Sequence, residues 1–123
     1  MNAPATPQLL LRIDDRRYAL ESRFVEEILE LEPPQSLPFL PRAVRGVAMW
    51  RERPLPVVDL ELLLERENGN PPLGERQFPR GVFVRCGELE AIVGCDGVAS
   101  SDRVTDADVP IAIDELLQGL SER

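Results

Sequence analysis

VRGVAMWRERPLPVVDLELLL, residues 44–64, is the most informative stretch of this sequence. An apolar run ends at Trp50, the charged link Arg51-Glu52-Arg53 follows, and a second apolar run spans residues 55–60. Two short apolar runs joined by a brief polar link are typical of an antiparallel hairpin. Leucines at helical spacing come next, so we expect a short helix over Glu61–Arg66.

Two prolines qualify this hairpin. Pro54 and Pro56 both lie in the returning run, and a proline has no backbone N–H to donate to a neighbouring strand. We therefore expect the returning strand to be an edge strand, or to have its proline nitrogens turned away from its partner.

Length, composition and charge narrow the class of protein. A chain of 123 residues with 43% hydrophobic and 29% charged residues is typical of one soluble globular domain. The formal net charge is −8, all 14 cations are arginines, and 5% of residues are aromatic. These values argue against nucleic acid as a partner and against direct binding to an anionic membrane surface.

Residues with catalytic potential are scarce. The chain has no histidine, which excludes a Ser-His-Asp or Cys-His nucleophile and the common zinc patterns. Asp14-Asp15 and the pair Asp106 and Asp108 lie in segments expected to be turns, where solvated aspartate is common. We expect no enzyme activity, no cofactor and no metal.

No apolar run approaches the ~20 residues that a membrane span needs. Residues 1–7 are small and polar without a preceding basic segment, so we expect a disordered tail and no signal peptide. The expected location is the cytoplasm.

The remaining elements follow in order. Before the first hairpin we expect a strand at Gln8–Ile13, a return strand at Tyr18–Glu21, and a short helix capped by Ser22 and ended by Pro33-Pro34. Phe24, Ile28 and Leu31 would share one face of that helix. We expect an extended segment over 35–43 to lead into the first hairpin, and beyond that hairpin a long loop over 66–80, a strand near Val98 or Val104, and a last helix over Ile113–Leu120.

A second hairpin can be predicted with its register. Val82–Cys86 and Leu89–Cys95 flank Gly87-Glu88, a pair suited to a two-residue type II′ turn. That turn pairs residue 86 with 89 and residue 82 with 93, which makes one face wholly apolar and places Arg85 opposite Glu90. Cys95 would then lie opposite residue 80, so we expect buried thiols rather than a disulfide.

Together these elements predict an all-β barrel or sandwich with minor short helices. The pattern V-x-G-V-x-x-x-R-x-x-x-L-P-V-V-D-L, which starts at Val44, resembles the CheW-like coupling domain of bacterial chemotaxis. The resemblance runs from Gln8 to about Val98 and includes Tyr18, Val25-x-Glu27-Ile28 and Asp96-Gly97-Val98.

The resemblance implies a fold and a role. CheW-like domains are pairs of small β-barrels without enzymatic activity, and they connect chemoreceptor tips to the regulatory domain of the histidine kinase CheA. Carried onto this chain, the receptor-facing surface would hold Val25, Glu27, Gly46 and Arg51, with Glu27 and Arg51 paired. The kinase-facing surface would hold Arg53, Leu55 and Val57.

The chain also departs from the family. Glu52 stands where the family usually has glycine, so the turn should avoid the backbone shape that favours glycine, while Met49 and Trp50 enlarge the apolar surface. Residues 8–123 would form one domain, but its second barrel half, 81–123, lacks the family's last hairpin. We expect an open sheet, either patched by residues 104–120 or paired with another chain as a homodimer.

Three functions stay open from the sequence. The leading one is an adaptor that couples a chemoreceptor to a CheA-type kinase. The second is a truncated decoy that binds one partner and regulates assembly. The third is an unrelated small β-barrel binding module. From the residues alone, Arg51 is either an interface hot spot beside Trp50 or a solvated turn charge.

Overall fold

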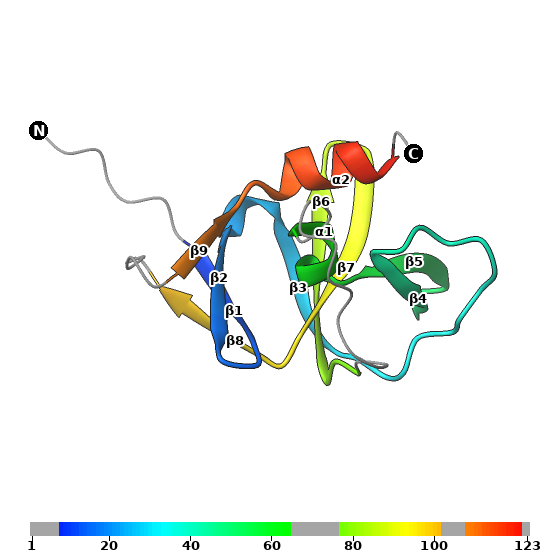
Figure 1. The fold of residues 1–123 in the computed structure, drawn as a ribbon, viewed down its shortest axis with the longest axis horizontal. Coiled ribbons are helices and arrows are strands. Elements are labelled where there is room, and N and C mark those ends of the chain that lie inside the picture. The colour runs from blue at the N-terminus through cyan, green and yellow to red at the C-terminus, as the bar shows by residue number, and fades with distance from the viewer. Residues whose placement is uncertain (1–7, 65–76, 102–107, 122–123) are drawn as a thin grey trace, which may run out of the picture.

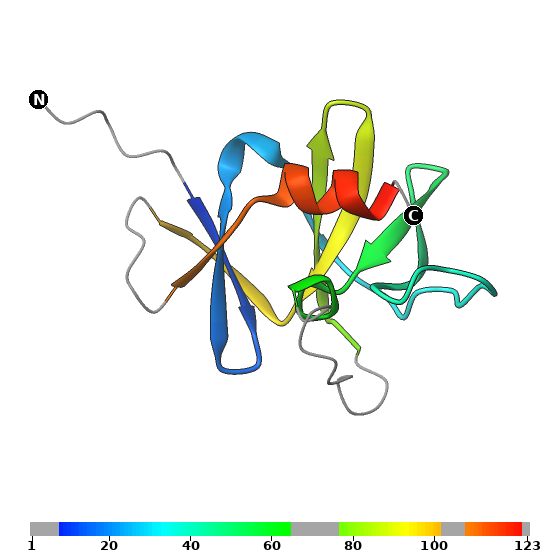
Figure 2. The ribbon, with the colours of Figure 1, turned by 45° about the horizontal axis from the view of Figure 1, so that its top comes forward.

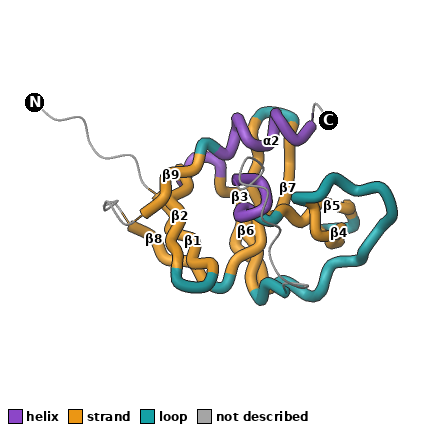
Figure 3. The backbone as a smooth tube through the Cα atoms, viewed as in Figure 1, coloured by secondary structure: helices purple, strands orange, loops and turns teal. Residues whose placement is uncertain are grey.

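Strands make up most of the described chain (Figures 1 and 3). The structure is a computed structural model, and it describes residues 8–64, 77–101 and 108–121. One sheet has the order β8-β1-β2-β9, with bounds Gly97–Ser101, Gln8–Ile13, Arg16–Glu21 and Asp108–Ile111. The other has the order β3-β6-β7-β5-β4, with bounds Val25–Glu30, Arg80–Cys86, Leu89–Cys95, Arg53–Val58 and Val44–Trp50. The helical segments are η1 (Ser22–Phe24), α1 (Leu60–Leu64) and α2 (Ile113–Ser121).

The expected all-β class with minor helices is confirmed. Each sheet ends in two edge strands, so within the described residues the expected barrels are two open sheets. The two sheets lie side by side along the long axis, with β8 and β9 toward one end and β4 and β5 toward the other (Figure 2).

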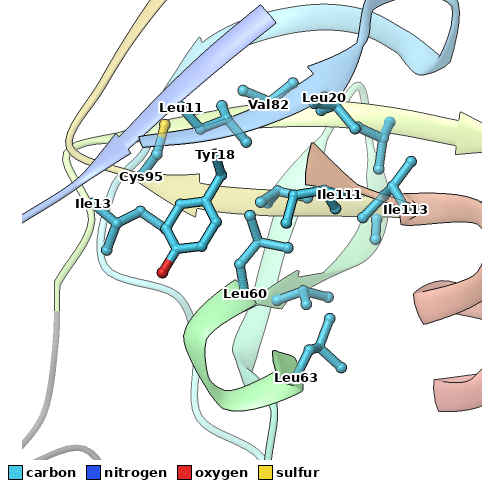
Figure 4. Close-up of a cluster of buried hydrophobic side chains, with 14 of the residues drawn as sticks. Leu11, Ile13, Tyr18, Leu20, Leu60, Leu63, Val82, Cys95, Ile111 and Ile113 are labelled. Atoms are coloured by element: carbon cyan, nitrogen blue, oxygen red, sulfur yellow. The ribbon is translucent and has the colours of Figure 1, made fainter. Parts of the chain in front are cut away.

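The main core lies between the two sheets. Alternate residues of β1, Leu9, Leu11 and Ile13, point into it because successive strand residues face opposite sides. Figure 4 shows side chains of both sheets and both α-helices meeting there. At its rim, the buried Tyr18 hydroxyl donates a hydrogen bond of 2.9 Å to Glu61 Oε2.

Asp59 starts helix α1. Its buried carboxylate accepts hydrogen bonds from the backbone N–H groups of Glu61 (3.0 Å) and Leu62 (3.3 Å). These amides have no partner inside the helix, so the aspartate satisfies them as an N-cap. The other carboxylate oxygen accepts a hydrogen bond from Arg45 Nε at 3.0 Å, which ties the helix start to β4.

The β6–β7 hairpin has the predicted register throughout, from Cys86 opposite Leu89 to Arg80 opposite Cys95. Gly87 has φ +66°, whereas Glu88 has a negative φ, in agreement with a type II′ turn. Both cysteines are free thiols; Cys95 is buried and Cys86 is half-buried. Burial raises the pKa of the Cys95 thiol to about 12 and also raises the pKa of Cys86.

A second, smaller core lies on the opposite face of this hairpin. It consists of four buried side chains, Leu55, Val57, Phe83 and Ile92. Trp50, Leu29 and Leu31 pack against it. The five-stranded sheet therefore buries apolar residues on both faces, because the main core covers one face and the sheet's own curvature encloses the other.

The helix predicted after Ser22 is wrong. Ser22–Phe24 form a single 3-10 turn without a side-chain cap, and Val25–Glu30 form strand β3. Exposure alternates along β3, with Glu26, Ile28 and Glu30 outward. Antiparallel pairing with β6 overrides the helical spacing, since local propensity in a short segment is weaker than a complete strand pairing.

Strand β5 lies between β4 and β7, so it is not an edge strand over its whole length. The sheet tolerates both prolines because β5 pairs with β7 only from Val57 onward. The strand thus acts as an edge in its first half.

The C-terminal part corrects one expectation and adds a strand. Asp108 is a buried residue of β9, and its Oδ1 lies 2.7 Å from Arg17 Nε, so it is not a solvated turn residue. Strand β9 was not expected and pairs in parallel with β2. The expected strand near Val98 (β8) and the last helix (α2) are confirmed. Val104, Asp106 and residues 66–76 of the predicted loop lie outside the described residues.

Candidate docking surface

The tip of the β4–β5 hairpin holds its most exposed cation in a strained turn. Trp50 pairs with Arg53 across a two-residue turn, in which Arg51 has φ +47° and Glu52 has φ +65°. Positive φ at both central residues is the type I′ geometry, which glycine and asparagine prefer. The prediction that Glu52 avoids the glycine-favoured shape is therefore wrong. For an ordinary L-residue this backbone shape costs roughly 1–2 kcal/mol.

The side chain of Arg51 packs on a pair of aromatic residues. Its guanidinium carbon lies 4.4 Å from the centre of the Trp50 ring. Trp50 in turn packs on the buried Phe83, with ring centres 4.5 Å apart at an angle of 59°. A cation–π contact with Trp50 thus links Arg51 to the second core, while the Arg51 side chain stays 73% exposed.

Glu27 of β3 approaches the same guanidinium. Its Oε2 lies 3.7 Å from Arg51 Nη2, so the expected pairing of these residues is present. Because Glu27 is 42% exposed, such a pair contributes only ~0–1 kcal/mol to stability. The pair spans the space between β3 and the tip of the β4–β5 hairpin.

A groove of about 530 Å³ runs between β3 and β4. Its walls include Leu29, Leu31 and Trp50, and the 66% exposed Met49 stands beside them. Among the described residues that line it, Glu30 and Glu32 are the charged ones. The groove therefore has a mixed polar and apolar lining, and Arg51 follows Trp50 of that lining in the chain. We call Glu27, Met49, Trp50 and Arg51 the tip surface.

Two other residues predicted to face the receptor occupy less exposed places. Gly46 is buried, and a Cβ on it would lie 2.6 Å from the backbone oxygen of Gln35. Its φ of +155° also disfavours a side chain. Val25 is half-buried and packs against the main core. The backbone of Gly46 therefore packs closely against the segment around Gln35.

The predicted kinase-facing surface needs a correction. Leu55 and Val57 are buried in the second core, with 5% and 0% exposure, so neither can meet a partner. Leu55 and Val57 are alternate residues of β5, so they point to the same face of the sheet. That face is enclosed in the second core. Of the three predicted residues, Arg53 alone is exposed.

Arg53 belongs to a row of charges across the sheet. Its two terminal nitrogens donate to the two Glu90 oxygens, both at 2.9 Å, and Arg85 Nη2 donates to Glu90 at 3.1 Å. The hydrogen bonds from Arg53, and then from Arg85, lower the pKa of the Glu90 carboxyl. Hydrogen bonding to Glu90 in turn raises the pKa of Arg53.

Comparison with known proteins identifies the family. The model of the CheW-like domain matches residues 8–120. The chain belongs to the CheW-like family. This is a non-enzymatic scaffolding family, in agreement with the expectation that the chain is no enzyme.

A solved CheW structure has the same fold. The crystal structure of the scaffolding protein TtCheW from Thermoanaerobacter tengcongensis matches with a TM-score of 0.60 and 20% identity. The match covers 77% of this CheW-like chain and 62% of TtCheW, less than two thirds of its length. A comparison with curated protein sequences found no match to this chain.

Within the described residues no three metal-ligating side chains lie together, and no helix there has the length and apolar character to cross a bilayer. Sequence reasoning missed the Trp50–Phe83 stack and the role of Glu90 as a partner of Arg53. The register of the second hairpin carried a signal for Glu90, since it places that residue on the same face as Phe83.

Proposed function

We propose that this chain is a non-enzymatic adaptor of bacterial chemosensory signalling. It couples a chemoreceptor to a CheA-type histidine kinase through protein–protein contacts, in the cytoplasm. Family membership over residues 8–120 supports the proposal. The observation that carries it is the presentation of the exposed Arg51 on the ring of Trp50 and beside Glu27, next to the groove that Trp50 helps to line.

The receptor side of the proposal follows from the chemistry of the tip surface. Arginine and tryptophan dominate binding energy when they lie at the centre of an interface. Here Trp50 is held by Phe83, so little side-chain entropy is lost on binding. The exposed guanidinium would donate to carbonyl or carboxylate oxygens of a helical receptor tip, and the groove would receive an apolar side chain.

The kinase side of the proposal rests on Arg53. It is the exposed member of the predicted set, and Glu90 holds it in a fixed orientation by two hydrogen bonds. The burial of Leu55 and Val57 reduces this surface and gives weight to the second candidate, a CheW-like decoy that binds one partner and regulates assembly.

A three-component pull-down separates the two candidates. The chain is immobilised with a receptor cytoplasmic fragment, and the regulatory domain of the kinase is added. An adaptor retains both partners at once, and Arg53→Ala then releases the kinase domain while the receptor fragment stays bound. A decoy retains one partner only. Failure to retain either one contradicts both candidates.

A further inference from the structure

The segment between β3 and β4 presents one aromatic side chain to solvent. Phe39 is fully exposed (102%), the highest value among the large apolar residues that the structure describes. Its backbone has φ +65°, a left-handed shape that a bulky residue rarely adopts. Burial of an apolar side chain is favourable, and strained backbone is concentrated at functional positions. Both features of Phe39 therefore point to contact with another molecule.

The chain holds Phe39 in this position from both sides. Pro38 precedes it and Pro41 follows two residues later, and each proline fixes one backbone angle. On the N-terminal side, Gln35 exchanges two backbone hydrogen bonds with β4. On the C-terminal side, the Val44 N–H donates to the Pro41 oxygen at 2.9 Å. Little conformational freedom is left to lose when Phe39 enters a binding site.

An apolar pocket of about 240 Å³ lies next to this segment. Its lining includes Leu40, the residue after Phe39, together with Leu117 and Leu120 of α2. Figures 1 and 2 show the segment between β3 and β4 at the end of the molecule toward which α2 runs. An apolar cavity of about 150 Å³ is large enough to bind benzene, so this pocket has room for a phenyl ring. We call it the α2 pocket.

We propose that two copies of this chain associate by exchanging Phe39, so that the ring of each copy enters the α2 pocket of the other. Because Leu40 lines the pocket, the ring and the pocket are neighbours on each copy. One two-fold axis between them therefore satisfies both contacts at once and closes the dimer. A ring and a pocket on distant faces would instead build open chains of molecules. Their proximity is the observation that selects a second copy as the occupant.

The charges around these features permit self-association. Each copy has a net charge of −8 and 29% charged residues, yet residues 33–41, PPQSLPFLP, contain no charge. The residues that flank this segment, Glu32 and Arg42, have opposite signs. Among the described residues that line the pocket, Glu90 is the charged one, and Arg53 donates two hydrogen bonds to it. The contact thus joins a neutral segment to a pocket whose glutamate is already paired, and salt should strengthen it by screening the net repulsion.

The size of the contact sets its strength. A phenylalanine buries about 150–250 Å², so the two rings contribute at most about 500 Å² toward the ~1,200–2,000 Å² of a typical stable interface. We therefore expect a weak dimer in a concentration-dependent equilibrium with the monomer. The proposal does not rest on the adaptor role, because it concerns the association of this chain with itself.

Sedimentation equilibrium of the full chain over a wide concentration range tests the proposal. We expect a monomer–dimer equilibrium, and a dissociation constant at least ~10-fold higher for Phe39→Ser, because two buried rings are lost at once. Val109→Ser is the matched control, since it removes an exposed apolar side chain from β9, at the other end of the molecule (Figure 1). It should leave the dissociation constant within about 2-fold, as for a surface substitution remote from the contact.

A mixing experiment tests the exchange itself. Leu120→Gln keeps Phe39 but makes the α2 pocket polar, whereas Phe39→Ser keeps the pocket and lacks the ring. Each variant alone has lost both contacts and a mixed dimer keeps one, so the mixture should associate at concentrations where each variant alone is monomeric. If Leu120→Gln fails to fold, Phe39→Ser decides the question alone, since its side chain is fully exposed.

Three results would overturn the proposal. The first is a wild-type chain that stays monomeric at all concentrations, whether its own Phe39 or another protein fills the pocket. The second is a Phe39→Ser variant that dimerises like the wild-type chain, or a dimer that Val109→Ser dissociates equally. The third is a pair of folded variants that shows no gain in association on mixing.

Discussion

Nη2 of Arg51 lies 3.7 Å from Oε2 of Glu27, although these residues come from opposite edges of the five-stranded sheet. Arg51 follows β4, and Glu27 lies within β3. Their contact shows that the sheet curves until its two edges face each other across the groove. The second core fills the inside of this curve, and the tip surface lies at its open side.

The Glu27–Arg51 pair should matter for binding and little for stability. We expect Glu27→Gln to change the free energy of unfolding by less than about 1 kcal/mol, because the pair is exposed. The same variant should weaken binding of a receptor fragment, since Arg51 loses its orientation. Urea unfolding and isothermal titration calorimetry measure the two effects. A large loss of stability with unchanged binding would assign the pair a structural role instead.

Glu52 should be replaceable by glycine with a gain in stability. Because Glu52 has φ +65°, Glu52→Gly should raise the free energy of unfolding by about 1 kcal/mol. Glu88→Gly is the matched control, since Glu88 also occupies the second position of a hairpin turn but has a negative φ. It should give no gain. A loss of stability in Glu52→Gly would show that the glutamate side chain makes a compensating contact.

Gly46 should act through the segment that covers it. Gly46→Ala places a methyl group 2.6 Å from the Gln35 oxygen, so the two hydrogen bonds between Gln35 and Val47 should break. We expect a loss of about 1–3 kcal/mol in the free energy of unfolding and faster hydrogen exchange at the Val47 amide. A variant with weaker receptor binding but unchanged exchange would instead mean that Gly46 contacts the partner.

Stability should fall at alkaline pH. Burial, with the hydrogen bond to Glu61 next in importance, raises the pKa of Tyr18 from 10.0 to about 12. Burial raises the pKa of Cys95 from 9.0 to about 12. Both groups lose their protons in the unfolded chain at lower pH than in the folded chain, so the unfolded state is favoured as pH rises. Stability should be fully present below about pH 9 and decline up to about pH 12.

Variants separate the two contributions to this alkaline decline. In Tyr18→Phe, the free energy of unfolding should fall less steeply above pH 10 than in the wild-type chain, because phenylalanine does not ionise. The variant should also lose about 1–3 kcal/mol at neutral pH, since the buried Glu61 loses a donor. Urea unfolding as a function of pH measures both effects. An unchanged pH profile in Tyr18→Phe would contradict the raised pKa of Tyr18.

Short-range patterns could be predicted from the sequence, and long-range ones could not. The register around Gly87-Glu88 follows from a two-residue turn and a consistent apolar face, so every pair was correct. The prediction for the segment after Ser22 was wrong because its pairing with β6 joins residues at least 50 positions apart, such as Glu30 and Arg80. Leu55 and Val57 were misplaced for a related reason, since nothing in β5 itself indicates that the sheet curves around them.

The same difference between short-range and long-range patterns holds for the candidate site. Arg51 and Glu27 were identified through the family resemblance, and their proximity is present in the structure. The support of Arg51 by Trp50 and Phe83 depends on tertiary packing between β4 and β6, which has no local signature. The positive φ of Glu52 was missed because a charged residue in that position violates the usual preference of the turn.

Binding of a chemoreceptor cytoplasmic fragment to Arg51→Ala tests the central claim most directly. Arg42→Ala is the control, because it removes the same charge from an exposed residue away from the tip surface. We expect Arg51→Ala to weaken the affinity by at least ~30-fold, as for a hot-spot arginine, while its unfolding free energy and the affinity of Arg42→Ala stay unchanged. Equal affinity of the two variants would show that the tip surface is not where the receptor binds.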